Sequence, residues 1–246
     1  MIAGISTGSQ TAAAPHAPGQ TLLFDADDTL WENNIYFEQA ITAFVSYLDH
    51  RVHSPEEVRE HLYTCERATI AVHGYGVKSF RRSLIECFEQ LSDGPITPER
   101  HARIVSFTEA IASQEIELLP DVVETLQELR GRHRLIMVTK GNFEEQTDKV
   151  ERSGLRNLFS AIEIPPEKNI AAYRELAIRH GCDPATTWMI GNSPKSDINP
   201  ALGAGLNAVF LPHDLTWALE HEVVDRPQGN SRLLELGRFS ELTRHF

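Results

Sequence analysis

Three carboxylates lie close together near the start of the chain, at Asp25, Asp27 and Asp28. The apolar run 21–24 (TLLF) comes directly before them and predicts a short buried strand. Burying this much negative charge at a strand end costs free energy unless a cation or a proton compensates it. The group therefore indicates an acidic site that does chemistry or binds a metal. The alternative is an acidic turn in which Asp28 or Thr29 caps the following helix.

The size and charge of the chain narrow the classes of function. Its 246 residues suit one large α/β domain or a core with an inserted module. A content of 41% hydrophobic and 24% charged residues is typical of a globular protein that buries a core. The formal net charge of -12 argues against nucleic acid and membrane surfaces as partners. An anionic substrate would need local positive charge or a bound metal.

The cysteines and the first residues bear on the compartment. The 3 cysteines are widely spaced and form no CxxC pair, which favours reduced thiols and a cytoplasmic location. No apolar run in the sequence approaches the ~18 residues of a membrane span. Residues 1–20 lack the pattern of a signal peptide, and their Ala, Gly, Ser, Thr and Pro content predicts a flexible leader.

Residues 32–118 predict an all-helical module. Ser54-Pro55-Glu56-Glu57 is a typical helix start, with Ser as N-cap, Pro in the first position and acids in the first turn. The apolar spacing shows no convincing strand in this segment, so we expect the helices to form a separate cap domain. The predicted helices cover about residues 31–49, 54–73, 78–91 and 97–117.

From residue 119 onward, predicted helices and strands alternate. This alternation predicts a parallel sheet with helices on both faces, built from residues 21–31 and 119–246. The helical module interrupts the pattern after the first strand, which places it over the carboxyl ends of the strands, where such sheets bind ligands. Strands are expected at 134–139, 159–164, 187–190, 207–211 and 232–236, and helices at 120–131, 143–153, 169–180, 198–204 and 239–246.

Four polar stretches each follow a predicted strand and should meet at one edge of the sheet. They are residues 25–27, 139–142, 163–168 and 191–197. One carboxylate could attack an electrophile, while the hydroxyl of Thr139 and nearby amides hold anionic oxygens and Lys168 neutralises charge. Asp197 and Asn192 could complete an oxygen-rich site for Mg²⁺.

The order and spacing of these stretches resemble the four motifs of the haloacid dehalogenase (HAD) superfamily, over about residues 21–211. Asp25-Ala26-Asp27-Asp28-Thr29-Leu30 is similar to the first motif, Thr139 to the second, Lys168 to the third and the segment 191–197 to the fourth. The inserted helices resemble the C1 cap of the superfamily. The resemblance implies a Rossmann-like core with an all-α C1 cap.

The resemblance also implies a reaction, the hydrolysis of a small phosphomonoester through an aspartyl-phosphate. Asp25 would be the nucleophile, and Asp27 would first protonate the leaving group and then activate water. Lys168 would pair with Asp25 and the phosphate. The substrate phosphate would bind at Thr139, Lys140, Gly141 and Asn142, and the ligands of Mg²⁺ would be Asp25, the backbone carbonyl of Asp27, Asn192 and Asp197.

Two positions depart from the superfamily pattern. Asn192 stands where an acid is usual, and its amide oxygen can bind Mg²⁺ but brings no charge. Pro165-Pro166-Glu167 precedes Lys168, where Gly-Lys-Pro is common, so Lys140 and Lys195 compete for the third-motif role.

Other functions stay open at this point. A 2-haloacid dehalogenase would attack carbon with the same Asp25, but Asp27 favours phosphate. A non-catalytic binding protein of this fold has support only from Asn192. In the cap, Lys78 and Arg81 could bind a second anionic group of the substrate or lie on a solvated helix face. Sugar phosphates, nucleoside monophosphates and phosphoglycolate-like acids are all possible substrates, and the oligomeric state is not predicted.

Overall fold

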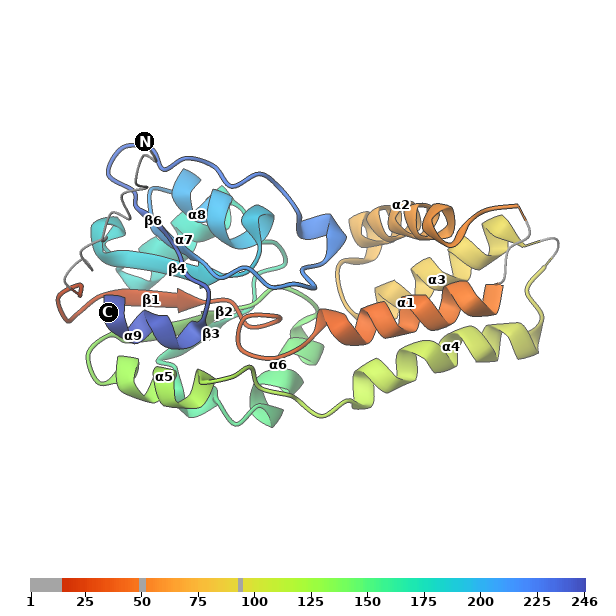
Figure 1. Cartoon of the computed structure of the whole chain (residues 1–246), viewed down its shortest axis with the longest axis horizontal. Coiled ribbons are helices and arrows are strands. Elements are labelled where there is room, and N and C mark those ends of the chain that lie inside the picture. The colour runs from red at the N-terminus through yellow and green to blue at the C-terminus, as the bar shows by residue number, and fades with distance from the viewer. Residues whose placement is uncertain (1–14, 49–51, 93–94) are drawn as a thin grey trace, which may run out of the picture.

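The computed structural model describes residues 15–48, 52–92 and 95–246. The chain forms two parts that lie side by side, a layered core around a sheet and a bundle of four helices (Figure 1). We call the bundle the helical cap. The carboxyl end of the first strand points toward it.

The core is built on six parallel strands in the order β3-β2-β1-β4-β5-β6. β1 lies in the middle, and its Leu22 is aligned with Leu135 on one neighbour and Trp188 on the other. Every residue of β1 is buried, as expected for a parallel strand covered on both faces. The strands are β1 (Thr21–Phe24), β2 (Arg134–Val138), β3 (Ala161–Glu163), β4 (Thr187–Gly191), β5 (Asn207–Phe210) and β6 (Leu233–Glu235).

Two separate apolar clusters hold helices against the two faces of the sheet. Leu22 and Phe24 point to one face and pack with α5 (Val122–Arg130), α6 (Phe143–Arg152) and α9 (Leu242–His245). Leu23, between them in sequence, points to the other face and packs with α7 (Ile170–His180) and α8 (Asn199–Gly203). The period-2 alternation of strand side chains thus divides the core between the two helical layers.

The helical cap has its own apolar core. Ile41, Leu62, Leu84 and Ile104 contribute to it from its four helices, and each is at most 1% exposed. The second helix begins with a full capping box, in which the Ser54 side chain and the Glu57 side chain each bind the other's backbone N–H. The helices are α1 (Asn34–Leu48), α2 (Pro55–His73), α3 (Val77–Leu91) and α4 (Pro98–Ser113).

The chain enters and leaves the cap through two paired segments. Trp31 and Leu118 form an antiparallel bridge. The N–H of Glu32 donates to the carbonyl of Glu117 at 2.9 Å, and the N–H of Leu119 donates to the carbonyl of Leu30 at 2.9 Å. These contacts join the two segments that connect the core to the helical cap.

The predicted parallel sheet with helices on both faces is confirmed. The first helix begins at Asn34, later than predicted, because Asp28 Oδ1 accepts the N–H groups of Asn33 and Asn34 and so fixes its start. The last cap helix ends at Ser113, and residues 114–117 are extended toward the return bridge. Among the described residues, no helix is both long and apolar enough to cross a bilayer.

The predicted leader needs a correction at its end. Residues 1–14 lie outside the described residues. His16 packs against the core, since its ring contacts Trp188 and Phe246 at 4.8 and 5.2 Å between centroids. Gln20 is 6% exposed and donates its amide to the carbonyl of Ala17. His16 and Gln20 therefore anchor the end of the predicted leader on the core, while residues 15 and 17–19 are exposed.

Candidate active site

A cavity of about 540 Å³ lies between the carboxyl ends of the strands and the helical cap. This volume is typical of a site for a small molecule. All the residues proposed from the sequence as site residues line it: Asp25, Asp27, Lys78, Arg81, Thr139, Lys140, Gly141, Asn142, Lys168, Asn192 and Asp197.

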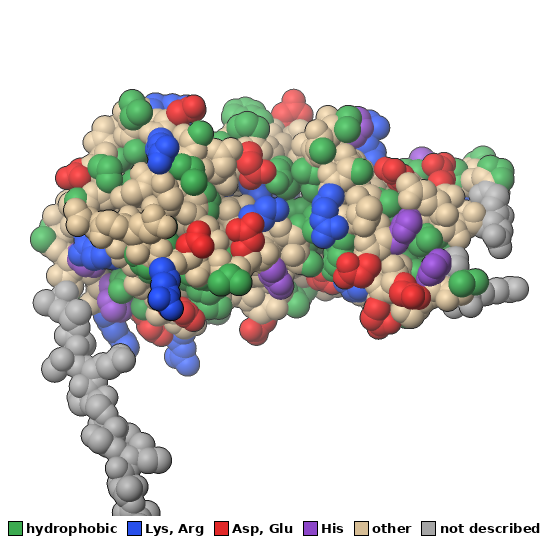
Figure 2. Space-filling model, turned by 90° about the horizontal axis from the view of Figure 1, so that it is seen from above, with side chains coloured by type: hydrophobic (Ala, Val, Ile, Leu, Met, Phe, Trp, Pro, Cys, Tyr) green, Lys and Arg blue, Asp and Glu red, His purple; other side chains and the backbone are tan. Residues whose placement is uncertain are grey.

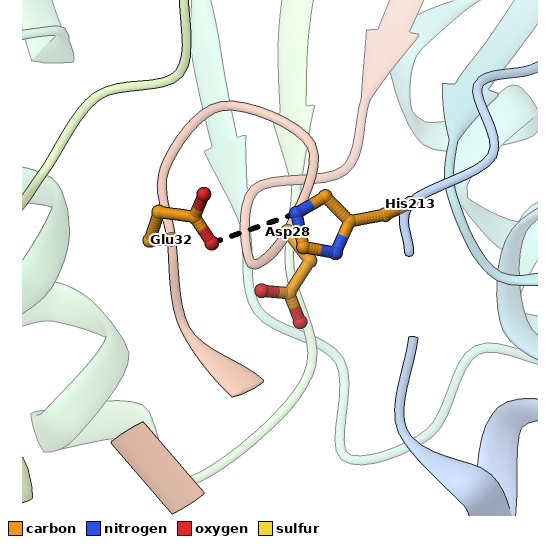
Figure 3. A group of neighbouring side chains, drawn as sticks. All are labelled: Asp28, Glu32 and His213. Atoms are coloured by element: carbon orange, nitrogen blue, oxygen red, sulfur yellow. Dashed lines mark ion pairs between the residues drawn. The ribbon is translucent and has the colours of Figure 1, made fainter. Parts of the chain in front are cut away.

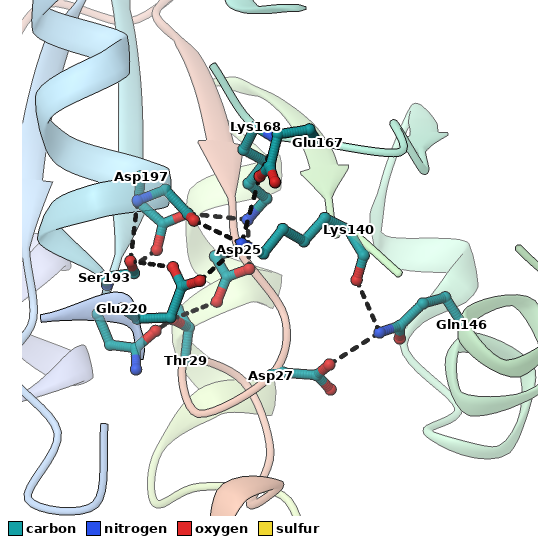
Figure 4. Close-up of polar contacts among 12 residues, drawn as sticks. Asp25, Asp27, Thr29, Lys140, Gln146, Glu167, Lys168, Ser193, Asp197 and Glu220 are labelled. Atoms are coloured by element: carbon teal, nitrogen blue, oxygen red, sulfur yellow. Dashed lines mark hydrogen bonds and ion pairs between the residues drawn. The ribbon is translucent and has the colours of Figure 1, made fainter. Parts of the chain in front are cut away.

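Asp25 lies at the centre of a buried network, directly after β1. Its carboxylate accepts hydrogen bonds from the Thr29 hydroxyl (2.9 Å) and the Lys168 ammonium. The same ammonium donates to Asp197 at 2.8 Å (Figure 4). Burial and the charge of Asp197 raise the pKa of Asp25 to about 7, against the opposing effect of Lys168. One ammonium group is thus paired with two carboxyl groups, which leaves an excess of negative charge at the site.

The position of Asp197 depends on a glycine. Asp197 lies on the turn Pro194–Ile198 after β4, where the Ser193 N–H donates to its Oδ2 at 3.0 Å. A Cβ at Gly191 would overlap the Asp197 carboxylate, so only glycine lets this side chain lie against the strand end. The carboxylate is 1% exposed and faces Lys168.

The donor set around Asp25 fits a hard divalent cation. Asn192 is 5% exposed, and its Oδ1 lies 3.3 Å from the Thr29 hydroxyl that donates to Asp25. Its Nδ2 donates to the Thr216 hydroxyl at 3.2 Å, which orients the amide oxygen toward Asp25. Carboxylate and amide oxygens suit Mg²⁺, and the unbalanced charge of Asp25 and Asp197 would be offset by it.

Asp27 points away from Asp25, toward α6 (Figure 4). Its carboxylate accepts hydrogen bonds from Lys149 (2.8 and 3.0 Å), Gln146 (2.8 Å) and the Trp31 indole (2.7 Å). Burial alone would raise the pKa of Asp27, but Lys149 and these hydrogen bonds hold it below its usual value. In this conformation the Asp27 carboxylate is ionised, and both of its oxygens accept hydrogen bonds.

The loop after β2 supplies the second side of the cavity. Thr139 is 1% exposed at the end of the strand. Gly141 has φ of 144°, a conformation that side chains rarely adopt, and a Cβ there would press on Gln146. The Asn142 side chain accepts two N–H groups of the first turn of α6 and so caps that helix.

The structure separates the three lysines that competed for the third-motif position. Lys168 alone among them contacts Asp25. Lys140 instead donates to Glu220 at 2.7 Å and Glu167 at 3.3 Å, and these charges raise its pKa against the effect of burial. Lys195 is exposed and donates to a backbone carbonyl.

The cap residues Lys78 and Arg81 line the cavity from α3, and they differ in exposure. Arg81 is half-buried, and its Nε donates to the Thr108 hydroxyl on α4 at 2.8 Å. Lys78 is exposed. Of the two side chains, Arg81 is held by a hydrogen bond to a neighbouring helix.

Tyr75, in the break between α2 and α3, joins the cap to the core. Its hydroxyl donates to Glu167 Oε2 at 2.6 Å, and the Lys140 ammonium lies 4.4 Å from the centre of its ring. Nearby, Glu145 Oε2 accepts the N–H of Val77 at 2.9 Å. We call these three contacts the cap–core junction.

Sequence reasoning missed several polar residues of the cavity. Gln146 and Lys149 lie three residues apart on α6, a spacing that places both on one helix face toward Asp27. That spacing was visible, but it gains meaning only when α6 is packed against the first motif. Glu66 on α2 gave no sequence signal, although it is 4% exposed and lines the cavity.

A second acidic group lies at the edge of the first motif. Potential ligand atoms of Asp28, Glu32 and His213 lie within 4.8 Å of one another (Figure 3). The Leu215 N–H donates to His213 Nδ1 at 3.3 Å, which leaves the ring proton of a neutral imidazole on Nε2, facing Glu32 Oε2 at 3.5 Å. His213 and Glu32 thus face each other, and Glu32 Oε2 has no hydrogen-bond partner among the described residues.

The chain is similar to known hydrolases and phosphatases. A family model described as haloacid dehalogenase-like hydrolase matches residues 20–205. N-acylneuraminate-9-phosphatase of Mus musculus is 26% identical over 202 residues, which cover 77% of this chain and 80% of that protein. Glyceraldehyde 3-phosphate phosphatase of Methanothermobacter thermautotrophicus is 32% identical over 105 residues, 40% of this chain and 46% of that protein.

Solved structures extend the similarity to the whole fold. A haloacid dehalogenase-like family hydrolase from Xanthomonas campestris superposes with a TM-score of 0.79 at 29% identity, and the match covers 93% of each chain. L-2-haloacid dehalogenase from Xanthobacter autotrophicus has a TM-score of 0.62 at 16% identity over 92% of this chain and 97% of that one. At that identity the second likeness shows a shared fold alone.

Proposed function

The chain belongs to the haloacid dehalogenase-like hydrolases, and we propose that within this family it is a Mg²⁺-dependent phosphatase. The proposed substrate is a phosphomonoester of a small metabolite, held in the cavity between core and cap. The observation that carries the proposal is the buried group of Asp25, Lys168 and Asp197. Two relatives named as phosphatases support the same reaction.

In the proposed reaction, an Asp25 carboxylate oxygen attacks the phosphorus atom. The ester P–O bond breaks, and the leaving oxygen takes a proton from Asp27. Asp27 then accepts a proton from water, which attacks the aspartyl-phosphate and regenerates Asp25. Lys168 and the Thr139 hydroxyl would hold the phosphoryl oxygens. Mg²⁺ bound by Asp25, the Asp27 carbonyl, Asn192 and Asp197 would reduce the repulsion between carboxylate and phosphate.

The acid–base role requires a movement of Asp27. Its carboxylate is now ionised and paired with Lys149, so it cannot donate a proton in this position. We propose that a bound substrate draws Asp27 toward the leaving oxygen and away from Lys149. The ion pair is about one fifth exposed on each side, so breaking it costs less than breaking a fully buried pair.

The net charge of the chain and its free cysteines bear on its binding partner and on its cellular compartment. Acidic and basic side chains are interspersed on the face shown in Figure 2, and the whole chain is acidic, so we propose a small phosphorylated compound and not a nucleic acid as the partner. Cys65, Cys87 and Cys182 are free, which supports a reducing, cytoplasmic location.

Hydrolysis of p-nitrophenyl phosphate with and without MgCl₂ tests the proposal. We expect Mg²⁺-dependent release of p-nitrophenol that Asp25→Asn abolishes. Activity that survives Asp25→Asn, or chloride release from 2-chloropropionate without metal, would contradict it. If the wild type hydrolyses none of a full panel of phosphomonoesters, with or without Mg²⁺, the result would favour a binding protein.

A further inference from the structure

Glu66 is a buried carboxyl group of the helical cap that the proposed reaction does not use. It lies on α2, is 4% exposed, and lines the cavity that also contains Asp25. Its side chain hydrogen bonds to the Trp217 side chain, but its Oε2 has no hydrogen-bond partner among the described residues. A buried polar atom without a partner costs free energy, so its presence calls for a ligand that completes it.

The lining of the cavity that contains Glu66 is typical of a binding pocket, and Glu66 is not part of an ion pair among the described residues. Phe37 and Ile70 give the cavity wall an apolar surface, and Ser83, which is 1% exposed, also lines it. A mostly apolar wall with a few placed polar groups is typical of small-molecule sites.

We propose that Glu66 is a specificity residue that hydrogen bonds to a hydroxyl group of the leaving group, so that the substrate is the phosphate ester of a polyol or sugar. With the phosphate at Asp25, the leaving group extends across the cavity toward α2. This inference rests on the proposed phosphatase activity and names the class of its substrate.

A hydroxyl group fits Glu66 better than an ammonium group does. Burial, reinforced by the charge of Glu38, raises the pKa of Glu66 to about 8, so the side chain is uncharged at neutral pH. An uncharged carboxyl both donates and accepts, which matches a hydroxyl. An ammonium group would require Glu66 to ionise where water is excluded.

The test compares three six-carbon phosphate esters, each at saturating Mg²⁺: sorbitol 6-phosphate, n-hexyl phosphate and 6-aminohexyl phosphate. We expect the wild type to prefer sorbitol 6-phosphate over hexyl phosphate by roughly tenfold or more in kcat/KM. Glu66→Leu should remove this preference, mainly by raising KM for sorbitol 6-phosphate, while kcat/KM for hexyl phosphate is unchanged or higher. Glu66→Gln, which keeps a donor and an acceptor, should retain most of the preference.

The matched control is Glu60→Leu, the same change on an exposed position of α2 outside the cavity lining. It should leave the activities on all three esters unchanged. Equal losses on sorbitol and hexyl esters in Glu66→Leu, or no loss on either, would overturn the inference. The inference would also be overturned if the wild type showed no preference among the esters, a result that does not depend on whether Glu66→Leu folds. It would likewise be overturned if 6-aminohexyl phosphate were the best substrate.

Failure of the inference can be told from failure of the proposed function. If the wild type hydrolyses p-nitrophenyl phosphate in a manner that Asp25→Asn abolishes, the phosphatase activity stands whatever the Glu66 variants do. If the wild type hydrolyses none of the phosphate esters, both proposals fall together.

Discussion

Lys168 is the residue that holds the two buried carboxylates of the site together. Its ammonium is 2% exposed and contacts both Asp25 and Asp197, which come from the ends of two neighbouring strands. Burial and the charge of Asp197 raise the pKa of Asp25, and one positive charge faces two carboxylates, so the site favours a further cation. This excess of negative charge supports the proposal that the site binds Mg²⁺.

At this scale the role proposed for Asp27 can be tested with Asp27→Asn. The amide keeps the shape and the contact with Trp31 but cannot carry the proton, so we expect kcat to fall about 10²–10⁴-fold with little change in KM. Steady-state kinetics with p-nitrophenyl phosphate measures this. Asp225→Asn, a surface carboxylate outside the cavity, serves as control. A fully active Asp27→Asn enzyme would exclude the acid–base role.

The second prediction at this scale concerns the metal affinity that Asn192 sets. Asn192→Asp adds a carboxylate beside Asp25 and Asp197, and we expect the Kd of Mg²⁺ to fall roughly tenfold, as ligand charge increases. Isothermal titration calorimetry at fixed pH and salt measures the change. Without Mg²⁺ the variant should have a lower Tm than the wild type, since three carboxylates then repel one another.

The control for this experiment is Asn230→Asp, which adds the same charge at an exposed position. It should leave both the Mg²⁺ affinity and the Tm close to those of the wild type. An unchanged or weaker affinity in Asn192→Asp would mean that Asn192 does not act as a ligand.

Most site residues could be predicted because they follow strands. Asp25 and Thr139 each come directly after an apolar run, and Asp197 lies on the turn that follows β4. A parallel sheet brings the segments after its strands to one edge. Glu66 and Lys149 could not be predicted, because each lies within a helix. Which face of a helix meets the cavity depends on how that helix packs, and single-sequence patterns do not contain this information.

At the scale of elements, the cap–core junction decides how firmly the cavity is closed. It joins the break between α2 and α3 to the loops after β2 and β3 through Tyr75, Lys140 and Glu167. We propose that residues 32–118 form a cap domain that opens by breaking these contacts and bending at the two segments that join it to the core. The antiparallel bridge of those segments would guide the motion.

Tyr75→Phe tests the role of the junction. Loss of the hydrogen bond to Glu167 should favour the open cap, so we expect KM to rise roughly three- to tenfold while kcat changes little. Amide hydrogen exchange around Gly74–Val77 should become faster. Tyr47→Phe, on a cap helix outside the cavity lining, should change neither value. Unchanged exchange and KM in Tyr75→Phe would show that the junction does not hold the cap.

The limits of the elements were predictable where caps are local. Ser54 and Gly181 mark the start of α2 and the end of α7 as their residue types indicate. The start of α1 was predicted too early, because Asp28 fixes it from several residues away. A cap provided across a turn leaves no signal at the helix boundary itself.

At the scale of the whole molecule, buried charge makes stability depend on pH. The pKa of Glu66 is raised from 4.5 to about 8, so the folded state keeps a proton that the unfolded state releases in this window. The contribution of Glu66 to the free energy of unfolding therefore falls as pH rises from about 4.5 to 8 and is constant outside that range.

Glu66→Gln should remove this dependence. Relative to the wild type, we expect the variant to be more stable by on the order of 2–4 kcal/mol at pH 8.5 and equally stable near pH 4. Urea unfolding at several pH values measures the difference, with Glu60→Gln on the exposed face as control. A constant difference across this range would mean that Glu66 titrates normally in the folded protein.

The bridge between Trp31 and Leu118 has a consequence for how proteins of this design can change. The two ends of the cap meet as neighbours, and hydrogen bonds already join Leu30 to Leu119. We therefore propose that residues 32–118 can lengthen, shrink or be exchanged without altering the order of the strands. Related chains could thus differ in what they recognise while they keep Asp25 and its partners. The paired segments 30–32 and 117–119 are also the place at which one cap could be grafted onto another core.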